Sequence, residues 1–274
     1  MLKKEIDEAK QFIKESDAIL ITAGAGMGVD SGLPDFRGNE GFWKTYPAIE
    51  KLGISFEAMA NPQWFEENPS LAWAFYGHRL NLYRDTIPHD GFQILLDLVK
   101  SKNNDYFIYT SNVDGQFQKA GFSPEKIVEV HGSIHHLQCI ENCREEIWDA
   151  HEEEVVIDMK KFQALHTPKC KYCSSVARPN ILMFGDWSWN AQRTTTQEER
   201  FHIWIDSIRA KKKKLAIIEI GAGTAIPTIR LKGENLAQRI NKAKLIRINP
   251  REYLNKYRGW SLPYGGLEGL NKIL

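Results

Sequence analysis

Five short, almost continuous apolar runs are the feature that most restricts how this chain can fold. They occupy residues 18–22, 106–110, 127–130, 215–220 and 244–248. Runs of this length without alternation are typical of strands buried on both faces, as in a parallel sheet. Helical patterns separate them, at about residues 3–15, 91–101 and 232–242. The alternation predicts an α/β fold with a Rossmann-type, doubly wound parallel sheet.

Two long segments interrupt this alternation and predict a second, smaller lobe. Residues 38–90 are rich in aromatic side chains and helical in pattern, and Asn68-Pro69 provides a good helix start. Residues 135–183 contain the cysteines and show little periodicity. The predicted Rossmann-type domain therefore comprises residues 1–37, 91–134 and 184–274. The smaller lobe comprises residues 38–90 and 135–183.

All four cysteines lie in the second of these segments, as two close pairs. Three residues separate Cys139 from Cys143, and two separate Cys170 from Cys173. In a reducing compartment this clustering favours a metal over disulfides. Four thiolates suit tetrahedral Zn²⁺ and leave no open position, so we expect a structural zinc ribbon. The alternative is a set of four unligated thiols.

Composition argues against two classes of partner. The net charge of +1 gives no reason to expect direct binding to nucleic acid or to a membrane surface. The run of lysines at residues 211–214 is better interpreted as a solvated turn than as a basic patch. No stretch has the roughly 18 to 20 apolar residues of a membrane span, and the N-terminus lacks a signal-peptide pattern. We therefore expect a cytoplasmic protein.

A glycine-rich segment follows the first apolar run directly, at residues 22–28 (TAGAGMG). Small residues there allow the backbone to approach a phosphate, and the N-terminus of a following helix supplies N–H donors. A dinucleotide pyrophosphate fits such a loop. Taken alone, however, the pattern fits a simple tight turn equally well.

Further motifs in the same order resolve this ambiguity through a family resemblance. Residues 24–38 read GAGMGVDSGLPDFRG, residues 110–114 TSNVD, residues 130–132 VHG and residues 178–185 RPNILMFG. Gly223-Thr224 and Ile248-Asn249 follow. This series resembles the motifs of sirtuins, the Sir2 family of NAD-dependent deacylases, over roughly residues 15 to 270.

The resemblance implies an NAD site, with NAD as co-substrate. Small residues would approach its phosphates, Arg37 would lie near the pyrophosphate and ribose, and Phe36 would shield the reacting sugar carbon from water. The residues assigned to this site are Ala23, Gly24, Gly26, Asp35, Phe36, Arg37, Ser111, Gly223, Thr224 and Asn249.

The resemblance also implies the catalytic groups. His131 would be the general base for a ribose hydroxyl, since imidazole titrates near neutrality. Asn112 and Asp114 would orient the nicotinamide. The implied reaction removes an acyl group from a lysine of a protein or peptide and yields nicotinamide and O-acyl-ADP-ribose. Outside the family context, a structural histidine and a turn-forming Asn-x-Asp would explain the same residues.

Several departures from the family pattern keep alternatives open. Ser111 stands where the family usually has Gln, which suits an ADP-ribosyltransferase or NAD hydrolase on the same scaffold. A non-enzymatic NAD sensor is a third possibility. The strand at 178–185 is followed by Asp186-Trp187 in place of the usual Glu and apolar residue. Tyr76 and Arg79 resemble the pair of sirtuins that prefer succinyl- and malonyl-lysine, but they also fit a packing role.

Overall fold

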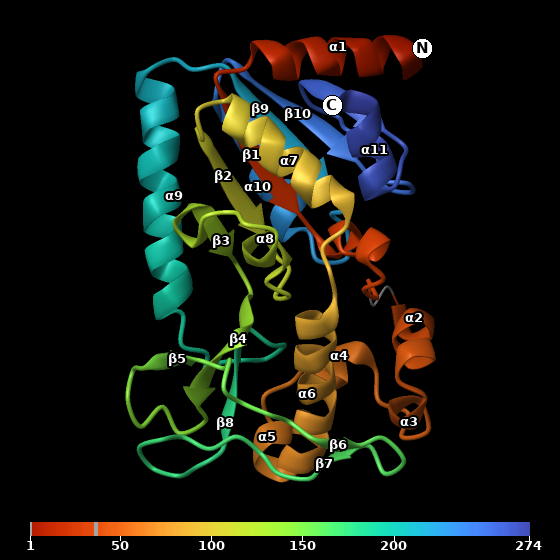
Figure 1. Ribbon diagram of the computed structural model, residues 1–274, viewed down its shortest axis with the longest axis vertical. Coiled ribbons are helices and arrows are strands. Elements are labelled where there is room, and N and C mark those ends of the chain that lie inside the picture. Colours follow the sequence, from red (N-terminus) through yellow and green to blue (C-terminus); the bar gives the residue numbers. More distant parts are fainter. Residues whose placement is uncertain (1, 36–37) are drawn as a thin grey trace.

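The computed structural model describes residues 2–35 and 38–274. Phe36 and Arg37, which the sequence assigns to the NAD site, lie outside these ranges. The described residues form a larger and a smaller lobe, and both ends of the chain lie in the larger one (Figure 1).

The larger lobe is built on a six-stranded sheet in which every neighbouring pair is parallel. Its order is β11-β10-β9-β1-β2-β3. The strands are β1 (Ala18–Ala23), β2 (Tyr106–Thr110), β3 (Ile127–Glu129), β9 (Leu215–Ile220), β10 (Ala243–Ile248) and β11 (Gly259–Leu262). All five predicted strands are confirmed. The edge strand β11 was not predicted, because its four residues are too few to show a clear strand pattern.

Helices cover both faces of this sheet, which explains why its strands are mostly apolar. Ile19 and Ile21 of β1 pack towards one face and Leu20 towards the other. The first face is covered by α1 (Leu2–Glu15), α7 (Asp90–Ser101), the short α8 (Gln116–Lys119) and α11 (Gly266–Ile273). The second is covered by α9 (Gln192–Ala210) and α10 (Thr228–Arg239). The doubly wound α/β prediction is confirmed.

Two helices differ from expectation. Helix α10 begins at Thr228 and ends at Arg239, so the range 232–242 was placed too late. Pro227 immediately precedes the first helical residue, and Ile240 is extended and buried. Helix α9 was not predicted, because its first turns are rich in polar and β-branched residues with weak helix propensity. Its buried residues Phe201, Ile205 and Ile208 nevertheless follow a helical spacing.

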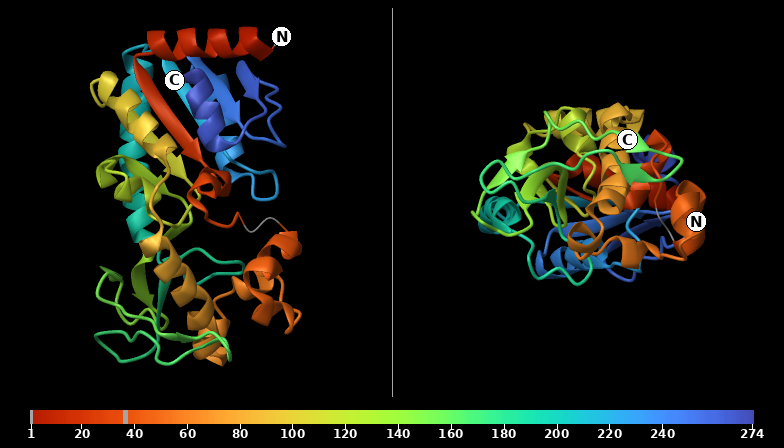
Figure 2. Two further views of the ribbon diagram at one scale, coloured as in Figure 1. Left: turned by 45° about the vertical axis from the view of Figure 1, so that its right-hand side comes forward. Right: turned by 90° about the horizontal axis from the view of Figure 1, so that it is seen from below.

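The smaller lobe combines five helices with short antiparallel strands (Figure 2). The helices are α2 (Gly38–Thr45), α3 (Pro47–Glu50), α4 (Phe56–Met59), α5 (Trp64–Glu67) and α6 (Pro69–Asp85). The strands are β4 (Gly132–Cys139), β5 (Ile147–Asp149), β6 (Ile157–Asp158), β7 (Gln163–Ala164) and β8 (Ala177–Ile181). Helix α6 begins as predicted, with the Asn68 side chain accepting a hydrogen bond from the backbone of Leu71 at 3.1 Å.

An aromatic core joins the helices of this lobe to its strands. Phe75 packs edge-on against both Phe42 and Tyr46, and Trp73 donates a hydrogen bond to the Ala177 carbonyl at 2.8 Å. The aromatic richness of residues 38–90 thus reflects a separate core. Among the helices in the described ranges, none is both long and apolar enough to cross a membrane.

Candidate functional site

The order in which the chain adds strands to the sheet reverses between β1 and β9. A crevice opens at this point, at the carboxyl ends of the strands. From β1 the chain continues outward to β2 and β3 on one side, and later to β10 and β11 on the other. Ligands of doubly wound sheets bind at such a switch point. Gly24 directly follows β1, and Gly221 directly follows β9.

The two loops at this point contact each other through glycine. The Gly26 N–H donates to the Gly221 carbonyl at 3.1 Å. A Cβ on Gly26 would lie 2.6 Å from the Gly221 Cα, and one on Gly221 would lie 2.4 Å from the carbonyl carbon of Gly26. Gly221 also has φ of +63°. Side chains are therefore excluded here by backbone contact, and the crevice floor stays open to a close ligand.

We expect Gly221→Ala to destabilise the fold by about 2 kcal/mol or more, through left-handed backbone strain together with a backbone clash. Gly53→Ala is the matched control, because Gly53 has φ of +66° but nothing within 4 Å of an added Cβ. Denaturant unfolding of both variants measures the difference. Equal losses of unfolding free energy in the two variants would mean that the clash between the two loops adds nothing to the strain of the left-handed backbone.

A cleft of about 850 Å³ begins at this crevice and is lined by residues of both lobes. It brings together eight of the predicted site residues: Gly24, Asp35, Ser111, Asn112, Asp114, His131, Gly223 and Thr224. Ala23, Gly26 and Asn249 are not among its lining residues. The Asn249 side chain is 0% exposed and donates to the Ala222 carbonyl at 2.9 Å, so it supports the loop that lines the cleft.

Asn112 and Asp114 lie in the loop that leaves β2. The Asn112 amide donates to the Gly24 carbonyl at 3.1 Å, which fixes it against the glycine loop. One Asp114 carboxylate oxygen accepts the Gln116 N–H at 3.0 Å. Burial raises the pKa of Asp114 to about 6, and the nearby Glu129 carboxylate adds to the rise. The structure therefore places an amide and a desolvated carboxyl group in the cleft wall.

His131 lies in the turn that joins β3 of the large sheet to β4 of the small one. Its backbone carbonyl accepts the Leu182 N–H at 3.0 Å. Burial lowers the pKa of the imidazole, and a hydrogen bond to the backbone of Ser111 partly opposes this. A neutral imidazole carries a lone pair on one ring nitrogen, which can accept a proton.

One face of α6 forms the wall of the cleft nearest Asp114. Tyr76, Arg79 and Tyr83 are spaced so that they share a helix face, and all three line the cleft. The Arg79 Nε donates to the Tyr83 hydroxyl at 3.1 Å. The guanidinium carbon lies 5.2 to 5.6 Å from the ring centroids of Phe75, Tyr83 and Tyr76. A cation in a mostly apolar wall is thus held by aromatic rings.

Arg251 and Glu252 are among the cleft residues that the sequence did not predict. The Glu252 carboxylate accepts the Thr224 backbone N–H at 3.2 Å and also binds the Thr224 hydroxyl. Arg251 pairs with Asp35 at 3.4 Å across the mouth of the cleft. Both follow β10 by a few residues, and position after a strand at the carboxyl edge is the signal that could have found them.

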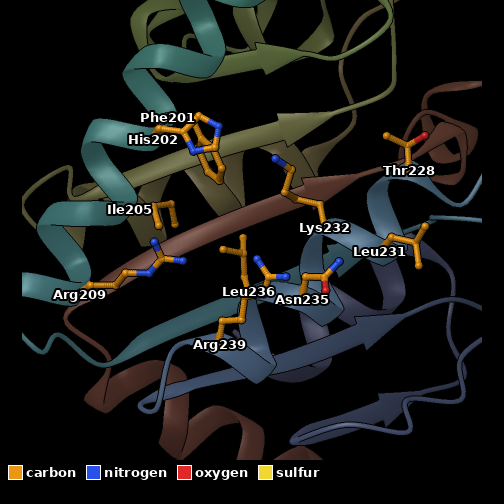
Figure 3. Close-up of a pocket in the computed structure, with 10 residues that line it drawn as sticks. All are labelled: Phe201, His202, Ile205, Arg209, Thr228, Leu231, Lys232, Asn235, Leu236 and Arg239. Carbon is orange, nitrogen blue, oxygen red and sulfur yellow. The ribbon is translucent and has the colours of Figure 1, made fainter.

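A second hollow, of about 450 Å³, lies between α9 and α10 (Figure 3). Lys232 and Leu236 of α10 face Phe201 and Ile205 of α9 across it. None of the described site residues lines this hollow. The two helices cover one face of the sheet, and no residue that lines the hollow also lines the cleft, so we assign the hollow no role in the chemistry of the cleft.

The four cysteines form one cluster, as the sequence predicted. The Sγ atoms of Cys139 and Cys173 are 3.5 Å apart, those of Cys143 and Cys170 are 3.6 Å apart, and all four lie within 4.8 Å of one another. Zinc–sulfur bonds of about 2.3 Å in a tetrahedron require sulfur atoms about 3.8 Å apart. The cluster fits a closed zinc site, and no aspartate, glutamate or histidine among the described residues joins it.

Similarity to known proteins agrees with this geometry. A model of the Sir2 family matches residues 24–206. A protein of Fusarium oxysporum f. sp. cubense, described as a probable bifunctional ADP-ribose hydrolase/ADP-ribosyltransferase, is 28% identical over 88% of this chain and 41% of its own length. An NAD-dependent protein deacylase of Leptospira interrogans is 35% identical over 68% of this chain and 66% of its own. The chain thus spans less than two thirds of either relative.

The fold is also similar to that of a Sir2 homologue solved in complex with NAD. The two structures have a TM-score of 0.73 and 24% identity, over 97% of this chain and 91% of that one. The sequence match over residues 24–206 covers more than half of the chain and assigns its family, and the structural similarity shows that the fold is shared. The chain belongs to the Sir2 family.

Proposed function

We propose that this protein is an NAD-dependent protein lysine deacylase. The observation that carries the proposal is the position of His131, Asn112 and Asp114 in one cleft that begins at the glycine crevice. The similarity to the Leptospira deacylase supports the same reaction class.

NAD fits the crevice because its floor is backbone. Gly24, Gly26 and Gly221 meet where no Cβ can be accommodated, so a pyrophosphate can approach the main chain closely. Glu252 and Thr224 lie beside the loop after β9, where a carboxylate can accept hydrogen bonds from a ribose diol. Asp35, Ser111 and Gly223 line the same cleft. The roles that the family resemblance gives Phe36 and Arg37 stay predictions, because both lie outside the described residues.

Asn112 and Asp114 and the two substrates have distinct roles in the proposed reaction. Bound NAD supplies an electrophilic ribose carbon with nicotinamide as its leaving group. Asn112 and Asp114 orient the nicotinamide amide by hydrogen bonds and so align the bond that breaks. The acyl oxygen of the modified lysine forms the new bond to the ribose carbon.

His131 completes the transfer as general base. It takes the proton of a ribose hydroxyl that adds to the acyl carbon, and one water is consumed overall. The products are free lysine, nicotinamide and O-acyl-ADP-ribose. Burial lowers the pKa of His131, which keeps the imidazole neutral and able to accept the proton of the ribose hydroxyl.

Zinc has a structural place in this proposal. Cys139, Cys143, Cys170 and Cys173 would hold it and thereby organise the ribbon over residues 135–183. A cytoplasmic location belongs to the same proposal, because thiolates can hold zinc only where disulfides do not form.

Mass spectrometry of products from NAD and acetyl- or succinyl-lysine peptide tests the proposal. Deacylation gives O-acyl-ADP-ribose and a lighter peptide. Unchanged NAD would favour a sensor, and free ADP-ribose with an intact acyl group would favour an NAD hydrolase. Either result would remove deacylation as the function.

The second candidate is mono-ADP-ribosylation of a protein. It is favoured by the match to the Fusarium protein, which covers 88% of this chain against 68% for the Leptospira deacylase. Ser111 in the cleft, where the family usually has Gln, points the same way. A target protein that gains the mass of ADP-ribose while its acyl groups stay intact would select this candidate.

Acyl preference gives a more specific prediction. Because Tyr76 and Arg79 line the cleft, a carboxylate at the end of a succinyl or malonyl group can bind the guanidinium. Such a bond is worth about 1.5–3 kcal/mol, so Arg79→Met should lower succinyl cleavage by roughly 10- to 100-fold and change acetyl cleavage little. The measurement is kcat/KM for both peptides.

Arg84→Met is the matched control, since Arg84 lies on the same helix and donates to the Glu153 carbonyl at 2.7 Å, outside the cleft. It should leave the ratio of succinyl to acetyl cleavage unchanged. Equal losses for both substrates in Arg79→Met would assign Arg79 to packing of α6.

A further inference from the structure

The hollow between α9 and α10 has an apolar floor. Phe201 and Ile205 of α9 and Leu236 of α10 line it, and all three side chains are buried. Leu231, which also lines the hollow, is 51% exposed. The volume of about 450 Å³ lies within the usual range of small-molecule sites, roughly 300–1,000 Å³. The hollow is therefore large enough for the apolar body of a small ligand, which would cover the exposed Leu231.

The charged residues that line this hollow are cations. Arg209, in the last turn of α9, and Arg239, in the last turn of α10, point into it from opposite walls (Figure 3). Lys232 lies further along α10 (Figure 3). Among the described residues that line the hollow, none carries a carboxylate. The hollow thus joins an apolar surface to an excess of positive charge.

The protein neutralises these three cations to different degrees. The Lys232 ammonium lies 3.5 Å from the Glu198 carboxylate, which approaches from α9. Arg209 pairs with Asp206 at 3.1 Å on the exposed surface of the same helix, where such pairs are weak. The Arg239 guanidinium forms no ion pair or hydrogen bond with another described residue. The end of the hollow between the two arginines is therefore the end that attracts an anion.

We propose that this hollow is a binding site for an amphipathic monoanion, namely a carboxylic acid with an aliphatic body. The carboxylate accepts hydrogen bonds from Arg239 and Arg209, because a guanidinium matches the geometry of a carboxylate. The aliphatic body lies over Leu236 and Leu231. The site is separate from the cleft and does not depend on the proposed deacylase activity.

The dimensions and chemistry of the hollow favour this ligand class over two others. From Leu231 to Arg239 the axis of α10 rises by about 12 Å, so a two-carbon acid would leave most of the apolar floor uncovered. An acidic polypeptide would satisfy the arginines but would place charged side chains over Phe201, Ile205 and Leu236, which offer them no hydrogen bonds.

Calorimetric titration of the full chain with sodium octanoate tests the site. Wild-type protein should bind octanoate saturably at one site, and octan-1-ol about 10-fold more weakly, because the alcohol lacks the charge. Arg239→Gln should weaken octanoate binding about 10-fold and leave octan-1-ol binding nearly unchanged. Leu231→Ala should weaken the binding of both ligands by about three-fold or more, through lost apolar contact. Both positions are exposed on α10, so the variants should melt like the wild type.

Arg200→Gln is the matched control, because Arg200 lies on α9 outside the hollow and pairs with Glu125 at 3.1 Å. It should bind octanoate like the wild type. Absence of saturable octanoate binding would overturn the site. Binding of equal strength in Arg239→Gln would also overturn it, because the acid would then lie elsewhere on the protein. A hexaglutamate peptide that binds more tightly than octanoate would overturn the ligand class and indicate an acidic polypeptide partner.

Discussion

His131→Ala should lower turnover of NAD and acyl-peptide by about 10²-fold or more, the usual cost of losing a positioned general base. NAD should still bind, because the glycine crevice and the loop after β9 do not depend on the imidazole. Steady-state kinetics together with NAD titration by calorimetry separates the two effects.

The pH profile supplies an independent check on the same residue. Burial lowers the pKa of His131, so the imidazole of the free enzyme stays neutral at pH values where an exposed histidine is already charged. The acid limb of kcat/KM should accordingly lie below the ordinary range for histidine. Wild-type turnover by His131→Ala would contradict the assignment.

Removal of zinc should have the largest effect on stability. Structural zinc sites in small domains contribute about 10–16 kcal/mol of binding energy, comparable to the whole stability of a domain. Cys170, which is buried in the cluster, is the most informative position. In Cys170→Ser we expect the zinc content to fall from one ion per chain to near none, with a marked loss of thermal stability.

Reversal by metal is the control for this experiment. Wild-type protein stripped with a chelator should lose the same stability and regain it with Zn²⁺ but not with Mg²⁺, which prefers oxygen ligands. Zinc-free protein with unchanged melting temperature and activity would show that the four thiols do not need the ion.

Much of the larger lobe could be predicted because its strands are buried on both faces. The runs at residues 106–110 and 215–220 match β2 and β9 to the residue. Helix α9 escaped prediction, since its apolar side chains are few and its long polar face dominates the pattern. The small strands β6 and β7, with two residues each, carry no period at all. The proposed domain boundaries stay a prediction.

The site residues could be predicted where several of them lie next to one another in a sequence motif. The motifs around Gly24, Asn112 and His131 lie in one cleft although they are far apart in the sequence. Glu252 could not be predicted from the sequence, because its position beside Thr224 depends on the pairing of β9 with β10.

The strand order has a consequence for synthesis of the chain. On one side β1 pairs with β2, about 90 residues later, and on the other with β9, where Leu215 lies opposite Ala18 about 200 residues later. At about 5–20 residues per second, a ribosome needs on the order of 10–40 s to deliver β9. During that interval one edge of the largely apolar strand β1 has no partner, which exposes the nascent chain to aggregation. The crevice between β1 and β9 therefore forms only late in translation, and a nascent chain that ends before β9 lacks one wall of the proposed NAD site.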